Sequence, residues 1–220
     1  MRTPLVVGNW KMHGGISEAR ALATAVRDGL KRPRGVEVAV CPPFTALPAV
    51  AEALAGSPIA WGAQNCHWED KGAFTGEIAP GMLVELGCRF VLLGHSERRH
   101  VFRETDEEIN RKVMAALRHG LVPLLCVGET EEERRQGLTF TVVEGQLLQF
   151  DLAGGAAPGG REEGGRTLGE RHVEDLAAGG ELAAGVGFAV DDAPGECAGV
   201  QAEPGEILQA DGRDGQLGDD

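Results

Sequence analysis

Residues 90–99 read FVLLGHSERR, and this stretch decides how the rest of the chain is interpreted. Its four apolar residues, 90–93, end at Gly94, a pattern typical of a buried β-strand that stops at a turn. His95 follows the turn, and we predict a short helix after it with Ser96 as the cap. The positive end of such a helix disfavours a protonated imidazole. We therefore expect a neutral His95 that can donate a hydrogen bond to a carbonyl oxygen.

Similar apolar runs recur along the first 150 residues. They are Leu5 to Val7, Val36 to Val40, Ile59 to Ala63, Phe90 to Leu93 and Leu121 to Val127. Their first residues lie 31, 23, 31 and 31 positions apart, enough for a strand, a loop, a helix and a second loop. Strands joined in this way run parallel, with the helices covering the outside. The spacing therefore predicts an α/β fold.

Helical patterns fill the intervals between these runs. One follows Ser17, which we interpret as an N-cap, and another is predicted over 106–118. Thr105 with Glu108 fits a capping box, as does Thr130 with Glu133. Each box would satisfy backbone donors that the first turn of a helix leaves unpaired.

Five strand–helix units fit two architectures, an open doubly wound sheet or the first part of an eight-fold barrel. The spacing does not choose between them. A dinucleotide-binding sheet carries Gly-x-Gly-x-x-Gly after its first strand, and a nucleotide triphosphatase carries a phosphate loop. Neither motif is present in this sequence.

The composition changes near residue 150. Residues 151–220 hold 17 of the 33 glycines and 16 acidic residues against four arginines, so almost all of the net charge of -13 lies there. Leu, Ile, Val and Phe supply only 12 of these 70 residues. Such a composition is typical of disordered segments. We divide the chain into 1–150, the N-terminal part of a (β/α)8 barrel, and 151–220, an atypical acidic Gly-rich segment that is disordered or read in a shifted frame.

Composition also excludes several classes of protein. The sequence has no apolar run long enough for a membrane helix and no secretory signal, which predicts a cytoplasmic protein with no membrane partner. It has no basic stripe, so we expect no nucleic-acid partner. Five scattered cysteines without metal-ligand spacing predict buried thiols and no metal site.

Polar residues follow each predicted strand. The segments are GNWKM (8–12), CPPF (41–44), AQN (63–65), GHSERR (94–99) and CVGET (126–130), with a further loop, GAFTGE (72–77). Over residues 5 to about 148 this set resembles the triosephosphate isomerase family. The resemblance implies a TIM barrel of which five βα units are recognisable. It also implies a cofactor-free and metal-free isomerase of glycolysis and gluconeogenesis that interconverts dihydroxyacetone phosphate and D-glyceraldehyde 3-phosphate through an enediolate.

Candidate site residues follow from these motifs. Because the carboxyl ends of parallel strands open on one face, Lys11 and His95 can converge on one small phosphorylated triose. Lys11 suits a phosphate and an enediolate oxygen. Asn9 is expected to hold the lysine head or a substrate oxygen, and Glu97 to pair with Lys11 or an arginine. We therefore expect Lys11, His95 and Glu97 to be catalytic and Asn9 and Lys11 to bind substrate.

The resemblance also implies a homodimer. The 72–77 segment looks like the family's dimerisation loop, which places Thr75 and Glu77 at a contact between subunits rather than in the active site of their own chain. Cys126 is interpreted as a small buried hydrophobe.

The family's glutamate base has no counterpart in this sequence. In the family this residue lies in a tract resembling Tyr-Glu-Pro-Val-Trp at the end of the sixth strand, and no such tract follows residue 150. Glu170, Glu174 and Glu181 are carboxylates without a positioning motif, and 185–190 is the one apolar run. The C-terminal three units are thus missing or replaced. The alternative hypothesis is a catalytically inactive remnant, truncated or frameshifted, that at most binds anions weakly or self-associates.

Overall fold

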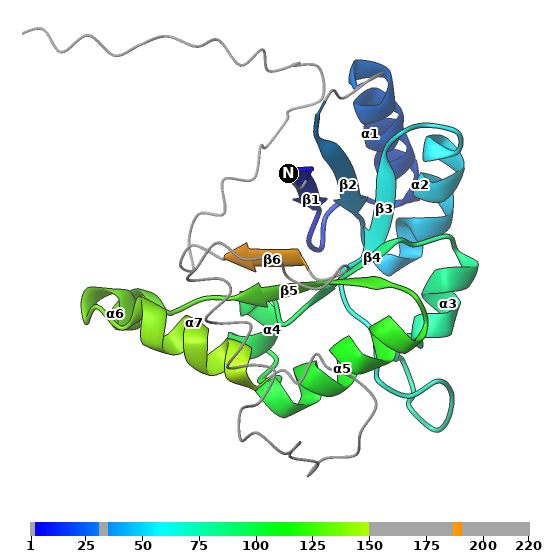
Figure 1. Ribbon diagram of the computed structural model, residues 1–220. Helices are drawn as coiled ribbons and strands as arrows, with labels where there is room; N and C mark the ends of the chain where they lie inside the picture. Colours follow the sequence, from blue (N-terminus) through cyan, green and yellow to red (C-terminus); the bar gives the residue numbers. More distant parts are fainter. Residues whose placement is uncertain (1–2, 31–34, 150–186, 191–220) are drawn as a thin grey trace, which may run out of the picture.

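A computed structural model of the protein describes residues 3–30, 35–149 and 187–190. Its strands form one parallel sheet, in which each strand pairs with the next one along the chain (Figure 1). Their bounds are β1 Leu5–Asn9, β2 Glu37–Cys41, β3 Ala60–Ala63, β4 Phe90–Leu93, β5 Val122–Val127 and β6 Gly187–Val190. Five of them match the apolar runs of the sequence within two residues at either end.

The strand order chooses between the two predicted architectures. A doubly wound sheet reverses its order after the first strands, whereas a barrel adds every strand on the same side. The observed order β1-β2-β3-β4-β5-β6 has no reversal. The described chain is therefore the parallel half-barrel that the sequence predicted, and its first five strands are those expected from residues 1–150.

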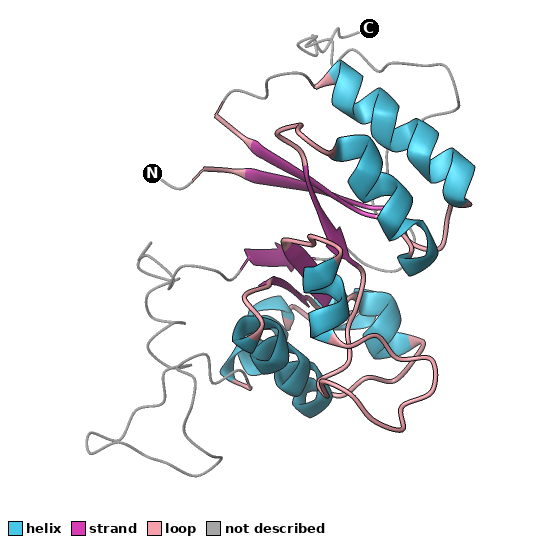
Figure 2. Ribbon diagram, turned by 90° about the vertical axis from the view of Figure 1, so that its right-hand side faces the viewer, coloured by secondary structure: helices cyan, strands magenta, loops and turns pink. Residues whose placement is uncertain are grey.

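Helices pack against the outer face of this curved sheet (Figures 1 and 2). They are α1 Ile16–Gly29, a 3-10 turn at Phe44–Ala46, α2 Leu47–Leu54, α3 Pro80–Glu85, α4 Ser96–His100, α5 Asp106–Arg118, α6 Glu131–Arg135 and α7 Thr139–Leu148. The helix predicted over 106–118 is confirmed as α5, and both capping boxes form. Ser17 was the wrong cap for α1, because the helix begins at Ile16 and the Glu18 carboxylate accepts the backbone N–H of Gly15.

Alternate residues of each strand face opposite sides of the sheet, as the pleat requires. On the inner side lies a cluster of small and apolar residues: Ala39, Cys41, Phe90, Leu92, Leu124 and Cys126. On the outer side, Val91, Leu93 and Leu125 are buried against the helices. Where β3 meets β4, Gly62 lets the two backbones approach closely, since a Cβ added there would lie 2.5 Å from the carbonyl oxygen of Phe90.

The sixth strand comes from the Gly-rich segment. Gly187–Val190 pairs in parallel with β5, Leu124 opposite Gly187 and Val127 opposite Val190. It lies within the apolar run 185–190 noted in the sequence. The remaining predictions for 151–220, including those for Glu170, Glu174 and Glu181, lie outside the described residues, and the division at residue 150 stays a prediction.

Candidate active site

The Glu97 carboxylate lies between two of the predicted active-site side chains, Lys11 and His95. Its Oε1 lies 2.9 Å from Nζ of Lys11, and its Oε2 lies 3.4 Å from Nδ1 of His95. Lys11 follows β1, whereas His95 and Glu97 follow β4, so residues distant in the sequence meet at the carboxyl ends of the strands. The sequence left open whether Glu97 pairs with Lys11 or an arginine, and the structure gives it Lys11.

His95 is buried, with 7% of its surface exposed, and it is the N-cap of α4. Its Nδ1 accepts the backbone N–H of Glu97 at 3.3 Å. Ser96, predicted as the cap, is instead the first residue of the helix. A ring nitrogen that accepts an N–H carries no proton of its own, so this bond places the proton of a neutral imidazole on Nε2.

Lys11 has a left-handed backbone conformation, with φ of 49°. This region is uncommon for residues other than glycine, and it persists where neighbouring groups hold it. The Lys11 N–H donates to Oδ1 of Asn9 at 3.0 Å, and its carbonyl accepts from Nε2 of Gln64 at 2.8 Å. The Asn9 side chain therefore holds the backbone of the lysine. Its expected role in holding the lysine head or a substrate oxygen stays a prediction.

Gln64 is a site residue to which the sequence analysis gave no role. Its Nε2 donates to the carbonyls of both Lys11 and Cys41, each at 2.8 Å, and so ties the end of β3 to the ends of β1 and β2. The available signal was its position, one residue after β3 in the segment Ala63-Gln64-Asn65. Only the three-dimensional arrangement shows which carbonyls its amide reaches.

A second set of contacts supports the end of β5. The buried Glu129 carboxylate accepts from Nε of Arg134 at 2.8 Å and from the Thr139 hydroxyl at 3.0 Å. The bond from Arg134 is the main cause that holds the pKa of Glu129 below its usual value, against the opposing effect of burial. In addition, the Gln146 side chain pairs with both the N–H and the carbonyl of Gly128. These bonds fasten the turn after β5 to α7.

Comparison with known proteins places this arrangement in a family. The triosephosphate isomerase family model matches residues 4–156. This chain belongs to the triosephosphate isomerase family. The match covers the strand ends that carry Lys11, His95 and Glu97.

Individual relatives agree with the family match. Over 154 residues, the chain is 56% identical to the triosephosphate isomerase of Carboxydothermus hydrogenoformans and to that of Herpetosiphon aurantiacus. In both cases 70% of this chain matches 61% of the relative, so the chain spans about three fifths of their length. The crystal structure of triosephosphate isomerase from Bartonella henselae is 42% identical with a TM-score of 0.64, covering 67% of this chain and 61% of that one.

The loop predicted as the triosephosphate isomerase dimer contact lies between β3 and α3 and projects from the body (Figure 1). Thr75 and Glu77 are both exposed on it. The Phe74 ring packs against His67 with ring centroids 4.4 Å apart, and the Glu77 N–H donates to the Phe74 carbonyl. The loop is thus internally braced, with Thr75 and Glu77 facing solvent.

Buried thiols match their predicted character. Cys41, Cys66, Cys88 and Cys126 are all buried, and none of these four thiols is in a disulfide. Burial raises the pKa of Cys66 to about 12 and that of Cys88 to about 11, and it raises the pKa of Cys41 further. Such thiols remain protonated near neutral pH, which suits packing rather than nucleophilic attack. Cys197 lies outside the described residues.

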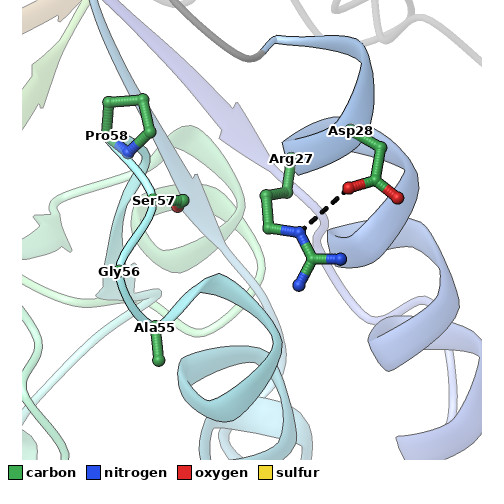
Figure 3. A pocket seen from close by; sticks show the side chains of 6 residues that line it. All are labelled: Arg27, Asp28, Ala55, Gly56, Ser57 and Pro58. Carbon is green, nitrogen blue, oxygen red and sulfur yellow. Dashed lines mark hydrogen bonds and ion pairs between the residues drawn. The ribbon is translucent and has the colours of Figure 1, made fainter.

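A separate surface hollow lies between the end of α1 and the loop that precedes β3 (Figure 3). It is lined by Arg27, Asp28 and residues 55–58. Arg27 donates to the Ala53 carbonyl and pairs with Asp28. This hollow lies at the amino ends of the strands, away from Lys11 and His95, and we assign it no ligand.

The described ranges contain neither a cluster of metal ligands nor a membrane-spanning helix. Within residues 3–30, 35–149 and 187–190, no group of three or more His, Cys, Asp or Glu side chains could hold a metal ion. None of the helices in this part of the chain is both long and apolar enough to span a membrane.

Proposed function

We propose that this chain carries the carbonyl-polarising half of a triose-phosphate isomerase, which interconverts dihydroxyacetone phosphate and D-glyceraldehyde 3-phosphate through an enediolate. The observation that carries the proposal is the carboxylate of Glu97, which contacts Lys11 at 2.9 Å and His95 at 3.4 Å. The family match over residues 4–156 supports the same reaction. The cellular setting we propose is the cytoplasm, in glycolysis and gluconeogenesis.

Lys11 is the proposed substrate-binding cation. About a third of its side-chain surface is exposed, and its backbone is held on both sides by Asn9 and Gln64. A fixed ammonium stabilises negative charge where it develops, on the enediolate oxygen or on the phosphate. Glu97 lowers the cost of keeping this cation half-buried and limits the positions it can occupy.

His95 is the proposed hydrogen-bond donor to the substrate carbonyl. Because its Nδ1 accepts the Glu97 N–H, its proton lies on Nε2. Donation from Nε2 would stabilise negative charge on the carbonyl oxygen as the adjacent carbon loses its proton. The aldehyde then forms as the former carbonyl carbon and its oxygen each take up a proton, while the hydroxyl on the adjacent carbon loses its proton and becomes the new carbonyl. Two protons leave and two return, so the isomerisation is balanced without an oxidant.

The base that removes the proton has no candidate among the described residues. The sequence after residue 150 contains no tract resembling that of the family's glutamate, and the family match ends at residue 156. These two observations favour a second candidate function, an inactive remnant that at most binds anions or self-associates. Loss of a positioned general base lowers catalysis by roughly 10²–10⁴-fold or more.

One pair of measurements separates the two candidates. The purified chain is assayed for triose phosphate isomerisation beside His95→Ala, and binding of dihydroxyacetone phosphate is measured by calorimetry beside Lys11→Met. Activity that His95→Ala abolishes supports the isomerase and shows that a base is present outside the described ranges. Binding that Lys11→Met removes, without turnover, supports the remnant. A chain that neither binds dihydroxyacetone phosphate nor isomerises it would contradict both the isomerase and the anion-binding remnant.

We also infer a homodimer built on the loop at residues 72–77, with Thr75 and Glu77 at the contact. The support is their exposure on a braced, projecting loop and the family's resemblance. Thr75→Arg should shift the sedimentation coefficient from dimer to monomer, whereas Arg118→Ala, at the end of α5, should not. A wild-type chain that sediments as a monomer at high concentration contradicts this inference.

A further inference from the structure

The guanidinium of Arg99 is buried beneath the candidate active site, with 9% of the side chain exposed. Its Nε donates to the carbonyl of Gly94 at 2.6 Å, and its Nη2 donates to the carbonyl of Cys126 at 3.1 Å. Its Nη1 donates to Oδ1 of Asp106 at 2.5 Å. The three nitrogens of one side chain therefore join the end of β4, the end of β5 and the start of α5.

These contacts enclose His95 from both sides. The Gly94 carbonyl, which precedes His95 in the chain, accepts from the Arg99 side chain, and the carbonyl of His95 itself accepts from the Arg99 backbone N–H at 3.1 Å. The two peptide planes that flank the histidine are thus both bonded to one residue. Rotation of the plane that contains the Gly94 carbonyl would break a bond to the buried guanidinium, and rotation of the plane that contains the His95 carbonyl would break a bond to the Arg99 backbone.

Gly94 makes room for this arrangement. Its φ is 73°, in the left-handed region, and an added Cβ would lie 2.9 Å from Nη2 of Arg99 and 3.2 Å from the Cys126 carbonyl. The guanidinium therefore fills space that only glycine leaves open. Gly94 and Arg99 act as one unit.

The three acceptors around this side chain require arginine and would not be satisfied by another cation such as lysine. A buried charge is tolerated where it is paired and where its donors are satisfied, and Asp106 supplies the pairing charge. The planar guanidinium directs its donors along fixed, separate directions, whereas an ammonium is a compact point charge. Lysine at this position could not reach all three acceptors at once.

We propose that Arg99 is a positioning residue for His95. It fixes the Gly94–His95 peptide against the end of β5, and so sets the orientation in which Nδ1 of His95 meets the Glu97 N–H and Nε2 carries the proton. The consequence for catalysis rests on the proposed isomerase function, but the positioning itself does not.

The test is nitrogen NMR of the histidine ring in the chain labelled at histidine. In the wild type we expect one His95 species, with Nδ1 unprotonated and Nε2 protonated. In Arg99→Lys we expect this signature to be lost in favour of averaged tautomers, together with a displaced Glu97 amide resonance. Arg89→Lys is the matched control, since Arg89 pairs with Glu37 at the surface and should leave both signals unchanged.

Two further variants separate positioning from general destabilisation. Asp106→Ala keeps the arginine but removes the carboxylate that orients it, and it should change the His95 signature in the same direction. Arg99→Ala should regain the wild-type signature when methylguanidinium is added at millimolar concentration. Far-UV circular dichroism of each variant confirms that the ring is observed in folded protein.

The possible outcomes separate this inference from the proposed function. A folded Arg99→Lys or Asp106→Ala chain with unchanged His95 ring signals overturns the positioning role. If Arg99→Lys does not fold, the His95 ring signals of Asp106→Ala and the methylguanidinium rescue of Arg99→Ala decide whether the positioning role holds. Absence of isomerase activity, with the ring signals behaving as expected, would count against the proposed function and leave the role of Arg99 standing.

Discussion

Replacing Gly62 with alanine would insert a methyl group where β3 and β4 come closest. The added carbon would lie 2.5 Å from the Phe90 carbonyl oxygen, 2.8 Å from its Cβ and 2.9 Å from its carbonyl carbon. These distances are about 0.6–1.0 Å short of the roughly 3.5 Å at which non-bonded heavy atoms pack best. Two of the three obstacles are backbone atoms of a paired strand, so no rotamer change relieves the clash.

The size of the effect follows from this geometry. Overpacking a rigid core costs on the order of 3 kcal/mol. For a chain of this length, 1 kcal/mol changes Tm by about 2–4 °C, so Gly62→Ala should lower Tm by roughly 6–12 °C. Separating β3 from β4 would also disturb Gln64 and His95, which follow these two strands.

Gly145→Ala is the matched control, because it makes the same chemical change in an open position. Gly145 lies in α7, is exposed, and has no atom within 4 Å of an added Cβ. Alanine in a helix interior is about 0.5–1 kcal/mol more favourable than glycine. Thermal unfolding followed by circular dichroism should therefore move in opposite directions for the two variants. A Gly62→Ala protein as stable as the wild type would refute the close-approach argument.

Four other outcomes are expected. The pKa of Glu129 is lower in the folded state than in the unfolded state, so its contribution to stability is present above the unfolded-state pKa of about 4.3 and is lost as pH falls. The free energy of unfolding, measured with urea at several pH values, should therefore fall less at acid pH in Glu129→Gln than in the wild type. Burial raises the pKa of Cys88, so its contribution to stability is present below the unfolded-state pKa of about 8.5 and is lost as pH rises. Cys88→Ala should therefore lose less stability at alkaline pH than the wild type. Thr105→Ala removes the α5 cap and should cost about 1 kcal/mol, whereas Thr24→Ala, within α1, should cost nothing; equal losses would contradict the capping argument. Finally, translating the gene beyond codon 150 in the other two frames should yield a Glu-Pro-x-Trp tract, and its absence from both would reject the frameshift hypothesis.

The fold and the meeting of Lys11 with His95 could be predicted from the sequence. Apolar runs at regular intervals specify parallel strands, and the geometry of parallel strands brings residues after β1 and β4 to one end. The choice between open sheet and barrel was not accessible from spacing, because both architectures use the same unit. It depended on the strand order, which follows from packing across the whole sheet.

Local bonding was harder to predict where several groups could make the same contact. Ser96 is a good N-cap by residue type, yet His95 takes that position because its ring nitrogen reaches the Glu97 N–H. For Gln64 the only signal was its position after β3, since its acceptors, the carbonyls of Lys11 and Cys41, belong to two other segments. The positioning role proposed for Arg99 depends in the same way on carbonyls that β4 and β5 bring together.

The strand order also bears on how the chain assembles during translation. Each strand from β2 to β5 pairs with the one synthesised just before it, so every new pairing closes only a short loop. Short loops carry a small entropic cost, and a growing chain begins to fold from its N-terminus. Docking can therefore proceed unit by unit as the polypeptide leaves the ribosome, without waiting for residues that have yet to be made.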